Sequence, residues 1–335
     1  MEEGARDAPG EFWPEVEVLL ATYNGERFLR EQLDSILAQE YPSIRVLARD
    51  DGSSDRTPAI LAEYAERLPR RFTILPLGEP AGGTIENFRR LLEAATAMYV
   101  CFADQDDVWL PAKLRISMEA MRRLEDRQGH DRPLLVFTDL RVVDDALRTV
   151  RESMWDGAGL DPEAIHRLAR LLGQNVVTGC TALINRPMVE LARRMPPQAT
   201  MHDRWIGLLA SSRGAAAALR EPTVLYRQHQ QNVIGAALEK RSVRHVALRS
   251  RDDRGRRRER WRSEEQTEAL LTLHGAEMAL PARQTLAAYL RSGRSKSRLE
   301  RIWLTLRYGF FRSGILRNAA TLWDLCRRRS GDGLS

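Results

Sequence analysis

The sequence predicts an α/β protein in which helices flank a mostly parallel central sheet, followed by a helical, basic C-terminal extension. Two observations predict this architecture. Between residues 16 and 127, strand-like apolar runs alternate with helix-like segments, which is the chain order of a parallel sheet with crossover helices. From residue 240 the pattern turns helical and Leu-rich, with 23 Lys and Arg against 10 Asp and Glu.

The first four strands are predicted by short apolar runs that end in polar residues. They cover residues 16–22, 44–48, 72–75 and 98–103. Apolar residues recur at helical spacing after each of them, which predicts helices at 27–39, 58–68, 86–95 and 111–127. Pro58 fits the first turn of the second helix, with Asp55 or Thr57 near its N-terminus.

The next hundred residues are less regular. We expect strands at 134–138 and at the end of 176–184, a helix at 202–210, and extended segments at 215–219 and 223–226. No internal repeat is visible in the sequence.

Composition limits the class of protein. With 335 residues, 43% hydrophobic and 29% charged, the chain is globular rather than collagen-like, low-complexity or disordered. Cys101, Cys180 and Cys326 are too few and too scattered for a disulfide framework or a zinc site. The acidic N-terminus is no signal peptide, and no stretch reaches the ~18 apolar residues of a membrane span. We therefore expect a cytoplasmic protein.

The basic tail leaves several partners open. Such a tail suits nucleic acid, an anionic membrane or an acidic partner. Residues 302–326 place aromatic and Leu residues between arginines, as a helix in a membrane interface does. The other interpretation is a helical appendage packed on the catalytic domain or on a second subunit. An oligomer and peripheral contact with the inner membrane face are both compatible with this segment.

Polar clusters follow three of the predicted strands. In parallel sheets ligands bind beyond the carboxyl ends of the strands, so we expect these clusters to form one site. They are Thr22-Tyr23-Asn24, Asp50-Asp51 and Asp104-Gln105-Asp106.

Asp104 and Asp106 point to the same side of an extended segment and can hold Mg²⁺ or Mn²⁺ together with phosphate and water. The alternative is a loop of N-capping acids before the next helix. The Asp51 carboxylate could accept hydrogen bonds from a nucleobase or ribose. Alternatively, it could stabilise the Gly-Ser-Ser-Asp turn that follows it. Asp55 fits a helix cap better than a ligand.

Two further positions could carry chemistry. Asp203 opens a predicted helix, where the helix N-terminus favours the ionised form, so it could act as a general base or simply as a cap. His229 follows a strand and could bind a metal or phosphate, or be a structural histidine.

These segments recur together, in this order, in one protein family. The chain resembles a family 2 glycosyltransferase with the GT-A fold and is most similar to the rhamnosyltransferase-like bacterial branch that builds cell-surface polysaccharides. The resemblance covers about residues 14–236, between an N-terminal tail at 1–13 and a basic helical extension at 237–335. It rests on the run from Val16 to Thr57, Asp-Gln-Asp-Asp-Val-Trp at 104–109, Asn-x-x-x-Gly at 175–179, His-Asp-x-Trp at 202–205 and Tyr-Arg-Gln-His at 226–229.

The resemblance implies roles for single residues on the donor side. Thr22, Tyr23 and Asn24 would line the nucleotide pocket. Asp51 would hold the base, and Asp104 would contact the ribose or sugar.

It also implies the metal and the acceptor side. Asp106 would carry the Mg²⁺ or Mn²⁺ that bridges the diphosphate, and His229 would reach the metal or the diphosphate. Gly179 and Trp205 would lie on the acceptor side, and Asp203 matches the family's catalytic base.

Two positions depart from the family pattern. Arg204 stands where related sequences often have a bulky aromatic residue, and Gly82-Gly83 lacks the expected Asn-x-Gly. Because of these two departures, the identity of the donor sugar does not follow from the resemblance.

The implied activity is an inverting, metal-dependent transfer of L-rhamnose from dTDP-rhamnose to a saccharide or lipid-linked acceptor. A UDP-hexose or UDP-N-acetylhexosamine transferase of the same fold is the alternative. A nucleotidyltransferase fits less well, because residues 21–27 hold one Gly rather than a Gly-rich phosphate loop. A nucleic-acid- or membrane-binding protein with an inactive GT-A domain is the alternative outside this class. The part of the chain before residue 240 is acidic, which argues against nucleic acid as a partner.

Overall fold

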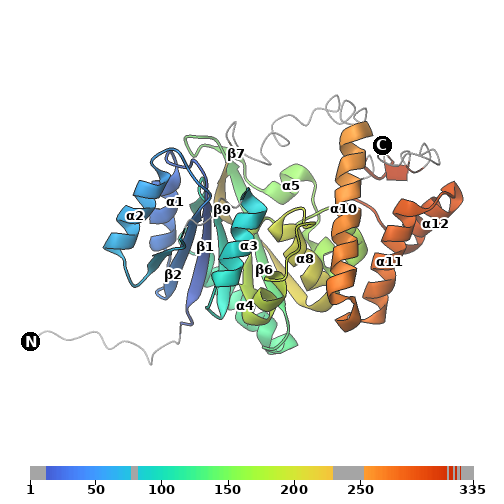
Figure 1. Cartoon of the computed structure of the whole chain (residues 1–335), viewed down its shortest axis with the longest axis horizontal. Coiled ribbons are helices and arrows are strands. Elements are labelled where there is room, and N and C mark those ends of the chain that lie inside the picture. Colours follow the sequence, from blue (N-terminus) through green and yellow to red (C-terminus); the bar gives the residue numbers. More distant parts are fainter. Residues whose placement is uncertain are drawn as a thin grey trace, which may run out of the picture.

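The computed structural model describes residues 13–76, 82–228, 253–314, 317–319, 321–322 and 325. Within these ranges a curled sheet of nine strands forms the centre and helices cover both of its faces (Figure 1). Alternate residues of the first strand enter two separate hydrophobic clusters, with Leu19 in one and Val18 and Leu20 in the other. Both faces of the sheet are therefore core, which is typical of a sheet with parallel strands covered by helices.

The strand order across the sheet is β3-β2-β1-β4-β8-β6-β9-β5, with β7 paired to β6. The first four strands in this order, from β3 to β4, run parallel to one another, and so do β6 and β9. The strands β8, β7 and β5 pair antiparallel to their neighbours. The strands are β1 (Val16–Thr22), β2 (Ile44–Asp50), β3 (Phe72–Ile74), β4 (Tyr99–Asp104), β5 (Val108–Trp109), β6 (Leu134–Val143), β7 (Thr149–Arg151), β8 (Leu183–Asn185) and β9 (Ala215–Arg227).

Helices connect the strands and continue beyond them. They are α1 (Leu29–Leu37), α2 (Thr57–Arg67), α3 (Thr84–Ala94), α4 (Lys113–Gln128), α5 (Met154–Ala158), α6 (Leu168–Gly173), α7 (Arg186–Ala192), α8 (His202–Arg213), α10 (Asp253–His274), α11 (Leu280–Arg294) and α12 (Arg298–Tyr308). Short 3₁₀ turns lie at Pro162–His166, Gly179–Thr181 and Gly275–Glu277.

The elements predicted from periodicity are all present, with small shifts at their ends. The two extended segments expected at 215–219 and 223–226 form one strand, β9, whose register against β6 shifts near Asp139. Asp55 accepts hydrogen bonds from the backbone N–H groups of Thr57 at 2.9 Å and Glu26 at 3.0 Å. Asp55 is therefore a turn residue that joins two loops, whereas the N-cap position of α2 belongs to Arg56, which makes no side-chain cap hydrogen bond.

The C-terminal helices pack on the helices that cover the sheet. Leu270, Leu286 and Leu304 are buried in the same cluster as residues of α6 and α8. Gln266 on α10 accepts hydrogen bonds from the backbone and hydroxyl of Thr200, at 2.7 and 2.9 Å. The described part of the extension is thus a packed appendage, although part of 302–326 lies outside the described residues.

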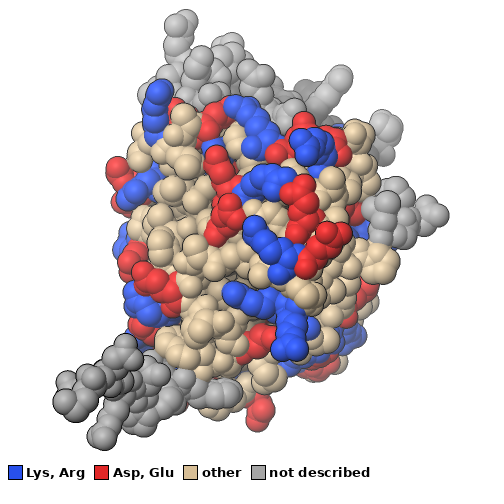
Figure 2. Space-filling view, turned by 90° about the vertical axis from the view of Figure 1, so that its left-hand side faces the viewer, with Lys and Arg blue, Asp and Glu red and all other residues tan. Residues whose placement is uncertain are grey.

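None of the helices in the described ranges has the length and hydrophobicity that a bilayer span requires. At the α1 and α2 end of the molecule, basic and acidic side chains alternate over the surface (Figure 2). Arg30 on α1 pairs with Glu63 on α2 at 2.6 Å, which shows how the charges on these helices neutralise one another.

Candidate active site

The predicted polar clusters meet at the carboxyl edge of the parallel half of the sheet. β2, β1 and β4 are neighbours, and their register places Thr22 beside Asp50 and Ala21 beside Asp104. Residues far apart in the sequence therefore share one rim, as the strand-end argument predicts.

Gln105 joins the ends of β1 and β4. Its side-chain amide accepts a hydrogen bond from the backbone N–H of Tyr23 and donates one to the backbone oxygen of Tyr23, both at 2.8 Å. A Cβ atom at Gly25 would come within 2.2 Å of the Gln105 Oε1 atom. Because Gly25 has no side chain, Gln105 can occupy this position. Tyr23 itself is 58% exposed to solvent.

Asp50 and Asn24 shape the loops that follow β1 and β2. The Asp50 carboxylate accepts hydrogen bonds from the Thr22 hydroxyl at 2.9 Å and from the backbone and hydroxyl of Ser53 at 2.7 and 2.6 Å. Asn24 has φ of 49°, and its side-chain oxygen accepts the backbone N–H of Ser54 at 2.9 Å. The Thr22 hydroxyl therefore points to Asp50 in the interior of the protein. The buried Thr22 side chain stabilises the end of β1 and is not exposed at the edge of the sheet.

Asp51 connects β2 to the start of α3. Its carboxylate accepts the backbone N–H of Gly83 at 2.9 Å and lies 3.5 Å from the Arg49 guanidinium. The buried Asn87 holds Arg49 in turn, accepting its N–H at 3.0 Å and donating to its backbone oxygen at 3.2 Å. This chain of contacts fixes the carboxylate that the sequence predicts for base binding.

An acidic cluster follows β4. One donor atom each from Asp104, Asp107 and Cys180 lies within 4.8 Å of the others. Burial, with the nearby charges of Asp106 and Asp203, raises the pKa of Asp104 to about 7. Burial, with the charges of Asp106 and Asp104, raises the pKa of Asp107 as well. Carboxylates that repel one another in this way favour a cation between them.

The donor set fits a hard divalent cation. Among the described residues, the fully buried Asp107 has a carboxylate oxygen, Oδ2, without a hydrogen-bond partner. Carboxylate oxygens are the ligands that Mg²⁺ and Mn²⁺ take, and the Cys180 thiol is a softer neighbour. The predicted ligand Asp106 is close enough to act on both Asp104 and Asp107, but it is not one of the three clustered residues.

Two buried basic side chains, Lys113 and Arg227, lie next to the acidic cluster. The Lys113 ammonium is 4.4 Å from the centre of the Trp109 ring, and burial lowers its pKa. Arg227 ends β9, donates from its backbone to Asp107 at 3.3 Å and from Nε to the Asp106 backbone oxygen at 3.0 Å. His229, predicted to reach the metal or diphosphate, lies outside the described residues.

Asp203 occupies the first turn of α8. Its carboxylate accepts hydrogen bonds from the Gly179 backbone N–H and from the Asn175 side-chain amide, both at 3.2 Å, and also from the Arg204 backbone. Burial raises the pKa of Asp203 to about 6, while these hydrogen bonds oppose the rise. Its helix position alone predicts an ordinary acidic group, but burial places its pKa closer to neutral, which suits a general base.

Gly179, His202 and Trp205, which lie beside Asp203, are all buried. Gly179 lies against His202, because a Cβ atom there would come within 2.3 Å of the His202 Nε2 atom. Trp205, predicted for the acceptor side, has 0% exposure, and its ring centre lies 6.0 Å from that of His274 on α10. The Trp205 ring is therefore packed inside the protein between α8 and α10 and is not exposed at a surface.

Five residues fix the site residues through hydrogen bonds or charges that could not be predicted from the sequence. Their roles depend on partners far along the chain, such as the 82 positions between Tyr23 and Gln105. An amide directly after a strand was the available indication for Gln105, and the third acid of the Asp-Gln-Asp-Asp run was the one for Asp107. The five residues are Gln105, Asp107, Asn175 and Arg227, which stand in the predicted clusters and motifs without a role of their own, and Asn87, which was not predicted.

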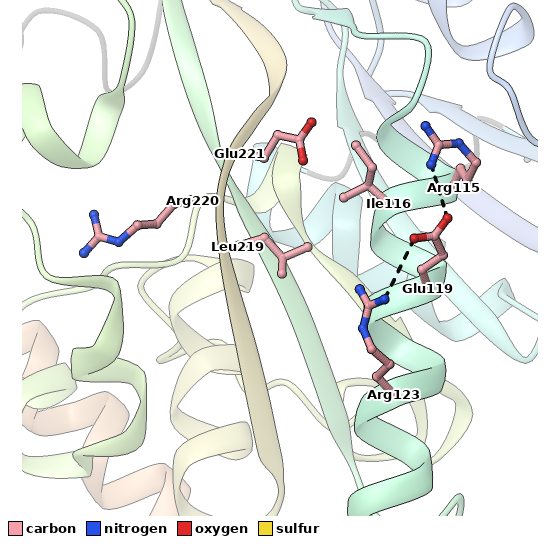
Figure 3. A pocket seen from close by; sticks show the side chains of 7 residues that line it. All are labelled: Arg115, Ile116, Glu119, Arg123, Leu219, Arg220 and Glu221. Atoms are coloured by element: carbon pink, nitrogen blue, oxygen red, sulfur yellow. Dashed lines mark hydrogen bonds and ion pairs between the residues drawn. The ribbon is translucent and has the colours of Figure 1, made fainter.

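A separate hollow of about 410 Å³ lies between α4 and β9 (Figure 3). Arg115, Glu119 and Arg123 line it from α4, and Glu119 pairs with both arginines. None of its lining residues is among those predicted for the site, so the hollow is not part of the strand-end rim.

Residues 17–139 match the model of glycosyl transferase family 2. The dTDP-rhamnosyl transferase RfbG of Shigella flexneri is 29% identical over 231 residues, covering 65% of this chain and 74% of that protein. The putative teichuronic acid biosynthesis glycosyltransferase TuaG of Bacillus subtilis is 33% identical over 108 residues, covering 32% of this chain and 42% of that protein. S. aureus TarS 1–349, also solved with UDP-GlcNAc, shares the fold with a TM-score of 0.51 at 16% identity, covering 93% of this chain and 91% of that one.

Proposed function

The chain is a glycosyltransferase with a family 2 domain and the GT-A fold, and from this premise we propose an inverting, metal-dependent transfer of a sugar to a hydroxyl acceptor. The observation that carries the proposal is Asp203 at the head of α8. This carboxylate is held by Gly179 and Asn175, and its charge acts on Asp104 in the acidic cluster. We assign the catalytic domain to residues 14–236 and the extension to residues 237–335.

The donor would bind along the rim of β1, β2 and β4. Tyr23 and Asn24 would contact the nucleotide, Asp51 its base, and Asp104 its ribose or sugar, while Thr22 would support the loop through Asp50. Asp106 and the clustered Asp104 and Asp107 would hold Mg²⁺ or Mn²⁺. A bound ion of this kind would neutralise the diphosphate leaving group.

Asp203 would remove the proton from the acceptor hydroxyl. A pKa of about 6 leaves this carboxylate ionised at neutral pH and makes it a stronger base than an ordinary Asp. The new bond to the anomeric carbon forms as the bond to the diphosphate breaks, so a single displacement inverts the configuration. Asn175 and Gly179 would keep the carboxylate aimed at the acceptor side.

We propose L-rhamnose from dTDP-rhamnose as the donor sugar, supported by the likeness to the dTDP-rhamnosyl transferase, which covers 65% of the chain. The acceptor would be a growing cell-surface polysaccharide or a lipid-linked saccharide. The enzyme would then work in the cytoplasm, at the inner membrane face. A UDP-hexose or UDP-N-acetylhexosamine donor is the second candidate, favoured by the UDP-GlcNAc complex of TarS with the same fold.

Thermal unfolding with dTDP, UDP, GDP and CDP, with and without Mg²⁺ or Mn²⁺, tests the proposal. A ligand at ~100 times its Kd stabilises the folded state by roughly 2.7 kcal/mol. We expect the largest metal-dependent shift with dTDP, its loss in Asp106→Asn, and its retention in Asp126→Asn on the exposed side of α4.

The outcomes separate the candidates. A preference for UDP would keep the mechanism and change the sugar. If no nucleotide shifts the unfolding temperature, the catalytic proposal fails, and binding through the basic extension with an inactive domain takes its place.

A further inference from the structure

The outer face of α12 carries three large apolar side chains in contact with solvent. Leu299 is 79% exposed, Trp303 is 59% exposed and Leu306 is 57% exposed. Their spacing of four and three residues places them on one stripe of the helix. We call Leu299, Trp303 and Leu306 the α12 stripe.

This grouping is particular to α12. The other large apolar residues that are exposed in the described part of the chain are distributed over separate elements. They are Tyr23, Met98, Val150, Trp261 and Leu280. Single exposed apolar residues are ordinary on protein surfaces, whereas a row of three on one helix marks an interaction surface.

The opposite face of α12 fixes which way the stripe points. Arg301, Leu304 and Thr305 are each at most 3% exposed on that face. The Arg301 guanidinium donates to the backbone oxygen of Ser295 at 3.0 Å, just beyond the end of α11. The helix cannot turn its stripe inward without breaking these buried contacts, so the stripe faces outward as part of the fold.

Basic residues border the stripe. At about 100° per residue, Leu306, Leu299 and Trp303 fall within a narrow sector, with Arg307 beyond one edge and Arg298 beyond the other. Arg298 and Arg307 are both exposed. The charge of Glu300, an acidic residue of the same helix, is matched by its ion pair with Arg291. The surface is therefore apolar in the middle and positive at its edges.

We propose that the α12 stripe docks on an anionic lipid bilayer, with its apolar side chains in the interface and its arginines at the headgroups. This combination, with a Trp in the apolar row, is that of a helix lying in a membrane interface. Anionic headgroups complement the positive border. The inference deepens the proposed function, on which it rests for its purpose, because a lipid-linked acceptor is held at such a surface.

Two other occupants fit the surface less well. A nucleic acid would use the arginines but would gain little from two exposed leucines. A second copy would bring like positive borders together, and one short helix offers far less than the roughly 800 Å² per partner of a stable interface. The length of α12 is 11 residues.

Flotation of the full chain with vesicles tests the inference without any substrate. We compare phosphatidylcholine vesicles with vesicles that contain both phosphatidylcholine and the anionic lipid phosphatidylglycerol. The wild-type chain should float with the anionic vesicles, and Trp303→Glu with Leu306→Glu should lower the bound fraction at least tenfold. Leu280→Glu is the matched control, because Leu280 is 62% exposed on α11 outside the stripe.

The metal-dependent nucleotide shift is recorded for every variant, so a lost fold or a failed catalytic proposal is distinguished from lost docking. Equal binding of wild type and the double variant would overturn the inference, as would absence of wild-type binding to anionic vesicles. A stripe-dependent dimer seen by light scattering without lipid would also overturn it, in favour of a second copy. Stripe-dependent binding to DNA rather than vesicles would overturn it in favour of nucleic acid.

Discussion

The guanidinium of Arg204 lies 2.9 Å from the hydroxyl of Ser263 and donates a hydrogen bond to it. The same nitrogen donates to the backbone oxygen of Leu172 at 3.0 Å. Arg204 follows Asp203 directly on α8, and Ser263 belongs to α10. The C-terminal extension is therefore attached to the helix that carries the proposed base.

Replacing Arg204 with Ala should destabilise the fold. The buried Ser263 hydroxyl and Leu172 oxygen would each lose one hydrogen bond, although Ser263 keeps its contact with Tyr289 at 3.0 Å. The net loss of one such bond costs about 0.5–1.5 kcal/mol. Urea denaturation measures the loss in the free energy of unfolding. Arg220→Ala is the control, since Arg220 has 67% side-chain exposure and its pair with Asp156 is solvent-exposed. Equal stability of the two variants would mean that Arg204 does not hold the extension.

Asp203→Asn should abolish sugar transfer while preserving nucleotide binding. The Asn side chain still accepts a hydrogen bond from Gly179, but it cannot take up the acceptor proton. A general base contributes roughly 10²–10⁴-fold to the rate, so we expect a loss of that size in kcat. Transfer assays give the rate, and thermal shifts with the donor nucleotide verify binding. Transfer at the wild-type rate would remove Asp203 from the mechanism.

The pH dependence of transfer should follow the protonation of Asp203. Burial raises its pKa from the ordinary value of 3.8 to about 6, so the carboxylate becomes protonated as the pH falls through about 6. A base works only when deprotonated, and the rate should therefore fall about tenfold per pH unit below that midpoint. Profiles of kcat/KM between pH 5 and pH 8 measure it. A flat profile in the wild type would contradict this assignment.

The parallel half of the sheet could be predicted from sequence because long apolar runs and helical spacing are local properties. β5 and β7 were not predicted, because two or three residues are too few for a periodic pattern, whereas β8 lies where a strand was expected at the end of 176–184. The rim residues were predicted from their positions at strand ends, whereas the contacts that hold them connect distant parts of the chain. Arg204 was visible as a departure from the family pattern, and its bond to Ser263 gives that departure a structural reason.

Gly25→Ala should disturb the junction between β1 and β4. The added methyl group would come within 2.2 Å of Gln105 Oε1, which would displace this side chain from its two hydrogen bonds to Tyr23. We expect a loss of about 1–2 kcal/mol of stability and a smaller nucleotide shift.

A double-mutant cycle with Gln105→Ala measures the coupling between the two positions. If displacement of Gln105 is the cause, the double variant should lose little more than Gln105→Ala alone. Fully additive losses would show that Gly25 acts through another contact.

His202 should make the protein sensitive to acid. Its ring lies 4.0 Å from the Phe88 ring and 5.1 Å from the Phe102 ring between their centres, and neither ring nitrogen has a hydrogen-bond partner among the described residues. Burial lowers the pKa of His202 to about 3. In the unfolded chain the ordinary value is about 6.5. Between these values the unfolded state binds the extra proton, so this contribution to stability is complete above pH 6.5 and is lost as the pH falls toward 3.

His202→Leu removes this dependence, because leucine does not titrate and is apolar like the two phenylalanines. The difference in the free energy of unfolding between wild type and variant should change by about 2 kcal/mol between pH 7 and pH 5, in favour of the variant at the lower pH. The raised pKa values of Asp104 and Asp203 act in the opposite direction, but they are present in both proteins and largely cancel in the difference. Urea denaturation at each pH supplies the values. The exposed control His130→Leu should leave the pH dependence as in the wild type, and an equal change in both variants would show that burial between Phe88 and Phe102 is not its cause.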